Sequence, residues 1–148
     1  MYVKEDTRLG CKTTTLEFVG ILLPFLTHPQ LMRSQYVVVK VDNIGCYFGW
    51  VNRQSAGDSL ANILIRSLHL LASHLACIVP IEHLLRKSCW EACVVDRLSR
   101  VSSTTAEDRQ LLDSFGQPSL PSCFKEWMCN PVEDWDLPLK LLKYIEKC

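Results

Sequence analysis

Apolar residues follow two spacings along this chain, one typical of helices and one of buried strands. Between Leu60 and Leu75 they recur every three or four residues, which predicts an amphipathic helix of about four to five turns with Asp58 as its N-cap. Residues 36–41 form an almost unbroken β-branched run, as in a strand covered on both faces. Residues 78–84 are predicted as a second strand. The helical stretch between them is long enough for a crossover connecting parallel strands.

Shorter helices are predicted on either side of this strand–helix–strand unit. A first helix opens at residues 13–17, and Pro24 should end or kink it. The other predicted helices cover residues 46–51, 92–98, 120–129 and 137–147.

Composition fits one ordinary domain. The chain has 148 residues, 48% of them hydrophobic, with sixteen basic and sixteen acidic side chains. This balance excludes a disordered acidic or basic tail. No apolar run approaches the roughly 18 residues of a membrane span, and the charged N-terminal residues do not resemble a secretory signal. The eight cysteines are expected to be free, mostly buried thiols, so we predict an intracellular protein of the cytoplasm or nucleus that is not secreted.

Charge is distributed unevenly. Residues 33–100 carry eight basic against five acidic side chains, whereas residues 101–148 carry five against eight. A modestly basic middle suits a surface that faces nucleic acid. Two solvated surfaces of ordinary charge are the alternative interpretation.

Three carboxylates stand at positions where a metal site could form. Asp42 directly follows the first predicted strand, Glu17 lies in the helix before it, and Asp96 lies in the helix after the second strand. Ligand sites in open α/β sheets gather at the carboxyl ends of strands. Phosphodiester cleavage by two divalent ions needs carboxylates that converge from separate elements, and Mg²⁺ prefers oxygen ligands. Each residue alone is equally compatible with a helix cap or a solvated acid.

Several short segments follow one another in a fixed order: Thr15-Leu-Glu17, Val37 to Asn43, Trp50-Val-Asn52, Leu60 to Leu75, Ile81-Glu-His-Leu84, Val95-Asp-Arg-Leu-Ser-Arg100, Pro118-Ser-Leu-Pro121, Trp127 and Pro131 to Asp136. The segments within residues 13–100 resemble the RNase H domain of retroelement reverse transcriptases. In that family a helix carries a Glu, the next strand ends in Asp-Asn, and the segment closes with Ala-Asp-x-Leu-Ser-Arg. The tail resembles the segment C-terminal to this domain in tyrosine-recombinase (DIRS-like) retroelements.

The resemblance implies a fold and an activity. The fold is an α/β RNase H-like domain over residues 1–100, with parallel strands 36–41 and 78–84 plus helices, followed by a linker and helical tail over 101–148. The activity is hydrolysis of the RNA strand of RNA–DNA hybrids, with the reverse transcriptase portion of the same element as a partner. The implied ligands of Mg²⁺ (or Mn²⁺), which are also the catalytic residues, are Glu17, Asp42 and Asp96. The implied nucleic-acid contacts are Asn43, Arg53, Lys87 and Arg97.

One family feature has no counterpart here. The fourth metal-binding carboxylate belongs on a strand further upstream of Glu17 than this sequence extends. We therefore expect an incomplete sheet in which one edge of strand 36–41 is unpaired, so that the chain self-associates or recruits residues 1–10 as a substitute strand. We also expect weak or absent nuclease activity. Two alternatives stay open: a non-catalytic remnant that binds nucleic acid or a protein, and a Cys-rich intracellular scaffold.

Other metal-binding patterns are weaker. His69 and His74 are five residues apart and do not share a helix face as an i, i+4 pair does. The spacings of Cys89, Cys93, Cys123 and Cys129 do not match paired zinc knuckles. We expect no zinc site.

Overall fold

The computed structural model describes residues 13–84, 105–107, 110, 114 and 119–148. None of the helices in these ranges is both long and apolar enough to cross a membrane. The predicted helix at 92–98 and the predicted role of residues 1–10 lie outside them. The elements are α1 (Thr13–Thr27), α2 (Pro29–Met32), β1 (Val39–Val41), α3 (Ile44–Asn52), α4 (Ser59–His74), β2 (Ile81–His83), α7 (Ser122–Cys129) and α8 (Leu137–Glu146).

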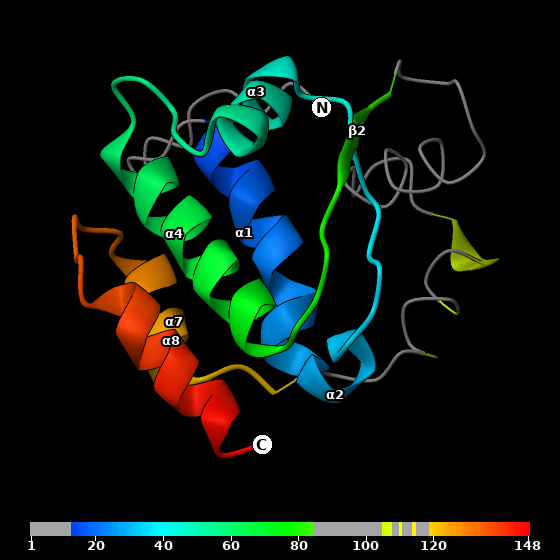
Figure 1. Ribbon diagram of the computed structural model, residues 1–148, viewed down its shortest axis with the longest axis vertical. Helices are drawn as coiled ribbons and strands as arrows, with labels where there is room; N and C mark the ends of the chain where they lie inside the picture. Colours follow the sequence, from blue (N-terminus) through cyan, green and yellow to red (C-terminus); the bar gives the residue numbers. More distant parts are fainter. Residues whose placement is uncertain (1–12, 85–104, 108–109, 111–113, 115–118) are drawn as a thin grey trace.

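The described part of the chain is mixed α/β and mostly helical. Helix α4 lies between α1 and α8, and the two strands run along the other side of the α1–α4 pair (Figure 1). Helix α3 contacts α1 and both strands, so it closes one end of this arrangement. The mixed α/β class predicted from the sequence is therefore confirmed.

Strands β1 and β2 form a parallel pair, as predicted. Val39 pairs with Ile81 and Val41 with His83, and an isolated parallel bridge joins Tyr36 to Ile78. The regular strands are shorter than predicted because Pro80 interrupts the ladder. Its carbonyl accepts from the Val39 amide at 2.9 Å, but proline has no N–H to return the bond.

The prediction that residues 36–41 are covered on both faces is wrong. Burial alternates along the run: the Tyr36 and Val38 side chains are 67% and 40% exposed, whereas Val41 is buried. Helices α1 and α4 cover one face of the sheet, and no described element covers the other (Figure 1). A β-branched run is equally suited to a half-buried strand, which is why composition alone misled.

In the described residues, β1 has β2 as its only strand neighbour. The amides of Val37 and Val39 donate to Ile78 and Pro80. Alternation of the ladder then directs the backbone groups of residues 36, 38 and 40 toward the opposite edge. Self-association through that edge stays a prediction.

Helix α4 begins as the sequence predicts. The Asp58 side chain accepts from the Ala61 amide at 3.0 Å, which is N-cap geometry. The buried Thr15 hydroxyl of α1 donates to the same carboxylate at 3.0 Å. One carboxylate therefore caps α4 and joins it to α1.

Pro24 does not end α1, contrary to one of the two expected outcomes. The helix continues to Thr27, whose hydroxyl donates to the Leu23 carbonyl at 3.0 Å. Phe25 and Leu26, directly after the proline, are almost completely buried. Their burial offsets the hydrogen bond that a mid-helix proline removes.

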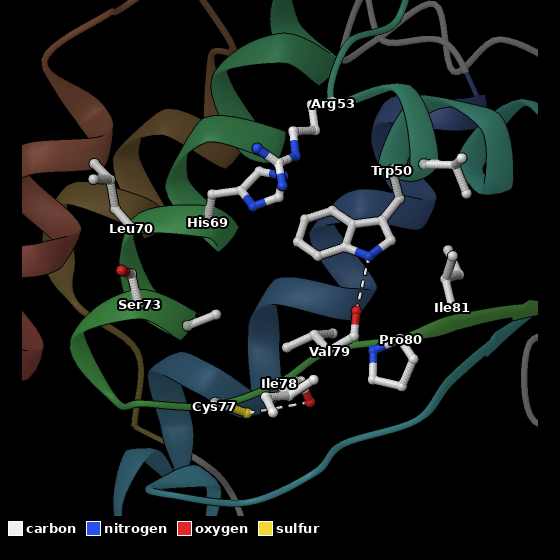
Figure 2. Close-up of a pocket in the computed structure, with 12 residues that line it drawn as sticks. Trp50, Arg53, His69, Leu70, Ser73, Cys77, Ile78, Val79, Pro80 and Ile81 are labelled. Carbon is white, nitrogen blue, oxygen red and sulfur yellow. Dashed lines mark hydrogen bonds between the residues drawn. The ribbon is translucent and has the colours of Figure 1, made fainter.

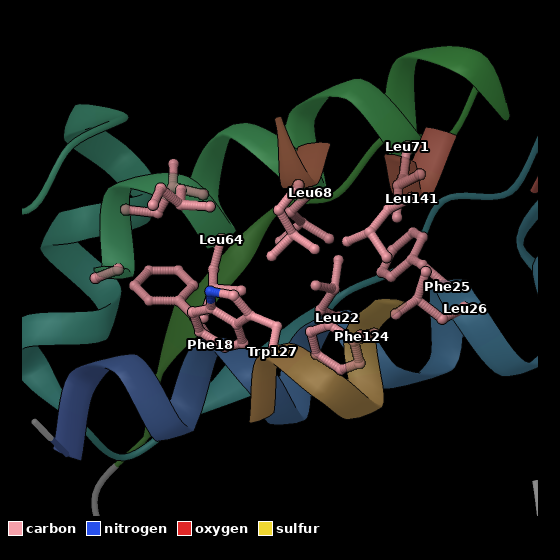
Figure 3. Packing of buried hydrophobic residues seen from close by; sticks show 14 of the residues in the cluster. Phe18, Leu22, Phe25, Leu26, Leu64, Leu68, Leu71, Phe124, Trp127 and Leu141 are labelled. Atoms are coloured by element: carbon pink, nitrogen blue, oxygen red, sulfur yellow. The ribbon is translucent and has the colours of Figure 1, made fainter. Parts of the chain in front are cut away.

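The C-terminal helices share one core with α1 and α4. Phe124 and Trp127 of α7 and Leu141 of α8 are buried among residues such as Leu22 and Leu71 (Figure 3). The Trp127 indole N–H donates to the Val132 carbonyl at 2.9 Å, which holds the connection between the two helices against α7. The helices predicted at 120–129 and 137–147 are thus confirmed.

Candidate functional site

The candidate site lies where β1 ends and α3 begins. Asp42 is exposed at the end of the strand, and the Asn43 side chain accepts from the Cys46 amide at 2.8 Å, which caps α3. Asn43, implied by the resemblance as a nucleic-acid contact, thus has a structural role in the orientation of the loop that carries Asp42.

Glu17 of α1 faces the same place as Asp42. Burial, and then the negative charge of Asp42, raise the pKa of Glu17 above its usual range. Cys46, on the first turn of α3, is fully buried, and its pKa rises to about 12 through burial and the charges of Glu17 and Asp42. The charge of Asp42 therefore acts on Glu17, and both carboxylates act on a buried thiol that stays protonated at neutral pH.

Two glycines on one face of α3 allow α1 to approach so closely. A Cβ on Gly45 would lie 3.0 Å from the Thr14 hydroxyl and 3.1 Å from the Asn43 side-chain oxygen. A Cβ on Gly49, one turn later, would lie 3.3 Å from the Phe18 ring. A side chain at either position would require the neighbouring Thr14, Asn43 or Phe18 side chain to shift by a few tenths of an ångström, so the two glycines favour the close approach of α1 to α3.

His83 ends β2 and lies beside Asp42. An imidazole nitrogen is 3.2 Å from the Asp42 carbonyl oxygen, and the His83 ring meets Tyr47 edge to face with centroids 6.1 Å apart. Sequence reasoning missed Cys46 and Tyr47. The signal available in the sequence was a small residue, Cys46, followed by an aromatic residue, Tyr47, shortly after Asp42-Asn43.

Of the other sequence-predicted site residues, the structure describes only Arg53, and it does not place Arg53 at this end of the sheet. Arg53 follows the last residue of α3, about 13 Å along the helix axis from its start, and lines a separate cleft. Asp96, Lys87 and Arg97 lie outside the described residues.

The described residues supply two carboxylates at this place rather than a complete set of metal ligands. In the described ranges no three His, Cys, Asp or Glu residues group as a metal site. Glu17 and Asp42 nevertheless fit a hard divalent cation, because their oxygens suit Mg²⁺ or Mn²⁺ and a cation would offset the repulsion that raises the pKa of Glu17.

Glu17→Gln should raise the free energy of unfolding at pH 7 by a few tenths of a kcal/mol, a small value because Glu17 is only half-buried. The folded-state pKa of Glu17 lies above its unfolded value of about 4.5. Neutral Glu17 therefore stabilises the folded state at low pH, relative to ionised Glu17, and this stabilisation is lost as the pH rises through the folded-state pKa.

Urea unfolding over a pH series measures this effect. In the wild type, the free energy of unfolding should decline as the pH rises through the folded-state pKa of Glu17. Glu17→Gln should remove this decline, whereas the matched control Glu126→Gln, which changes an exposed residue on α7, should keep it. An unchanged decline in Glu17→Gln would show that Glu17 is not strained by burial and Asp42.

Comparison with protein-family models, curated proteins and solved structures gives no match to this chain.

Proposed function

We propose that this chain is an RNase H-like domain that binds RNA–DNA hybrids and hydrolyses their RNA strand with Mg²⁺ or Mn²⁺. The observation that supports it most is the meeting of Glu17 and Asp42 at the carboxyl end of a parallel strand pair. Ligand sites in α/β folds form at such ends, and Asp96 would supply a third carboxylate from the residues C-terminal to β2.

Metal binding, positioning and phosphate contact would fall to different residues of the chain. Glu17 and Asp42 would hold the cation, which when bound stabilises charge on the attacked phosphate. Asn43 fixes the start of α3, and the neutral thiol of Cys46 fills the space beneath the acids without adding a third charge. Asn43, Lys87 and Arg97 would contact phosphates near the acids, so that the hybrid is recognised by shape and backbone. Arg53, which lines the separate cleft, would contact only phosphates farther along the hybrid.

Activity should be low. The resemblance implies four carboxylates and assigns three of them to residues of this sequence, so a site built from these three alone would leave one oxygen of the attacked phosphodiester poorly stabilised. Loss of such an electrostatic contribution commonly reduces rates by about 10²–10³-fold. The reverse transcriptase portion of the same element is the proposed protein partner.

A labelled RNA–DNA hybrid, incubated with the full chain and Mg²⁺ or Mn²⁺, tests this function. We expect salt-dependent hybrid binding and slow, metal-dependent loss of the RNA strand, with RNA alone and DNA duplex left intact. Absence of both hybrid binding and cleavage would contradict the proposal and favour the Cys-rich scaffold.

The described residues contain no group of three possible metal ligands, and this favours a second candidate, a non-catalytic nucleic-acid- or protein-binding remnant. Its signature in the same assay is hybrid binding that is insensitive to metal and accompanied by no cleavage.

A further inference from the structure

A second concave region lies at the opposite end of α3 from Asp42. It is an open cleft of about 800 Å³ between the end of α3, the second half of α4 and the segment leading into β2. Its polar and aromatic lining includes Trp50, Arg53, His69, Ser73 and Cys77 (Figure 2). The volume is within the range of small-molecule sites.

Aromatic rings form the fixed wall of this cleft. The Trp50 indole N–H donates to the Val79 carbonyl at 2.9 Å, which sets the orientation of the ring against the segment before β2. The indole then stacks on the His69 imidazole, with centroids 4.1 Å apart and planes 12° apart. The wall is therefore held by one hydrogen bond and one ring stack before any ligand arrives.

His69 and Arg53 both lack a polar partner at this wall. The Nε2 atom of His69 is buried and has no hydrogen bond to any described residue, which is uncommon for a buried polar atom and calls for a cause such as a missing ligand. Arg53 extends over the imidazole (Figure 2) and forms no ion pair within the described ranges. An uncompensated guanidinium thus lies beside an unpaired imidazole nitrogen.

We propose that this cleft binds a phosphomonoester with a flat apolar body, of which a nucleoside monophosphate is the natural class. Arg53 would hold two phosphate oxygens, since the guanidinium fork matches phosphate. To reach the phosphate, the Arg53 guanidinium would move off the His69 imidazole. This would expose Nε2 of His69 to the third phosphate oxygen. The flat body would pack on the apolar side of the cleft, where Val51 and Ile78 are 52% and 63% exposed.

Protonation of His69 should be coupled to this binding. Burial and the positive charge of Arg53 hold the pKa of His69 below its usual range. The negative charge of a bound phosphate would offset the effect of Arg53 and raise this pKa. Among the described residues that line the cleft, the other group that titrates near neutral pH is Cys77 of the segment before β2. Burial raises the pKa of Cys77, so its thiol stays neutral. Binding should therefore tighten as the pH falls through the pKa of His69.

Imidazole NMR signals of the full chain, titrated with AMP, inorganic phosphate and adenosine, test the proposal without reference to nuclease activity. We expect AMP to shift the His69 signals and raise its titration midpoint, and both phosphate and adenosine to bind at least about tenfold more weakly. Arg53→Gln should weaken AMP binding about tenfold or more. The matched control Arg66→Gln, on an exposed arginine of α4 outside the cleft lining, should bind as the wild type does.

A second variant separates folding from binding. His69→Gln should still bind AMP, more weakly, but lose the tightening at low pH. The proposal is overturned if saturating AMP leaves the His69 signals unmoved, if Arg53→Gln and Arg66→Gln bind AMP equally, or if His69→Gln keeps the pH dependence. Phosphate binding as tightly as AMP would overturn the role of the apolar side.

Discussion

Replacing Leu141 by Ala should lower the free energy of unfolding by about 2–5 kcal/mol, the usual cost of truncating a fully buried leucine. Leu141 is 0% exposed and projects from α8 toward the shared core, near Leu68 and Leu71 of α4 (Figure 3). The lost methyl groups would leave a cavity between these two helices. Since α4 also packs against α1, the loss should be felt by the whole described core.

Leu139→Ala is the matched control. Leu139 lies two residues away on the same helix and is 54% exposed, so its truncation should cost less than about 0.5 kcal/mol. Urea unfolding followed by far-ultraviolet circular dichroism and by tryptophan fluorescence should give one transition for each variant. Two separate transitions, with only the weaker one shifted by Leu141→Ala, would contradict a single core.

Asp42→Asn should reduce hybrid cleavage by about 10²–10³-fold and remove most Mg²⁺ or Mn²⁺ binding. Asn keeps the shape of the side chain but removes the charge that attracts the cation. The same change relieves the repulsion that raises the pKa of Glu17, so stability at neutral pH should hold or rise slightly. Loss of activity without loss of stability is the expected signature.

Cleavage rates, metal titrations and urea curves on the same preparation measure this signature, with Glu126→Gln as the control for removal of a remote acid. Metal-dependent cleavage that survives Asp42→Asn would show that the nuclease site lies elsewhere. Destabilisation by several kcal/mol would instead show that Asp42 is a structural residue.

Local signals in the sequence predicted the strand–helix–strand unit well. The apolar spacing of α4 and the Asp58 cap both depend on residues close in sequence, and both are observed. The two valine- and isoleucine-containing runs pair in parallel because the intervening helices require a crossover. These features need little knowledge of the rest of the fold.

Features that depend on distant residues were not predictable in the same way. Whether Pro24 ends α1 depends on the burial of Phe25 and Leu26 after it. Coverage of Tyr36 and Val38 depends on which face the helices occupy.

The candidate site shows the same division. Position after a strand was enough to single out Asp42, whereas its proximity to Glu17 depends on the close approach of α1 to the glycine face of α3. The stack of Trp50 on His69 joins residues from two helices, and no spacing in the sequence predicts this contact. Arg53, implied by the resemblance as a nucleic-acid contact, follows the last residue of α3 and lines the separate cleft.

Paramagnetic broadening by Mn²⁺ tests the central claim, that Glu17 and Asp42 form a divalent-cation site, most directly. Substoichiometric Mn²⁺ added to the ¹⁵N-labelled full chain should broaden the amide signals of Glu17, Asp42 and Cys46 more strongly than those of Arg53 and His69. It should have no such effect in Asp42→Asn. Broadening confined to the acidic residues before α8 (Glu133, Asp134 and Asp136), with Asp42 unaffected, would contradict the account.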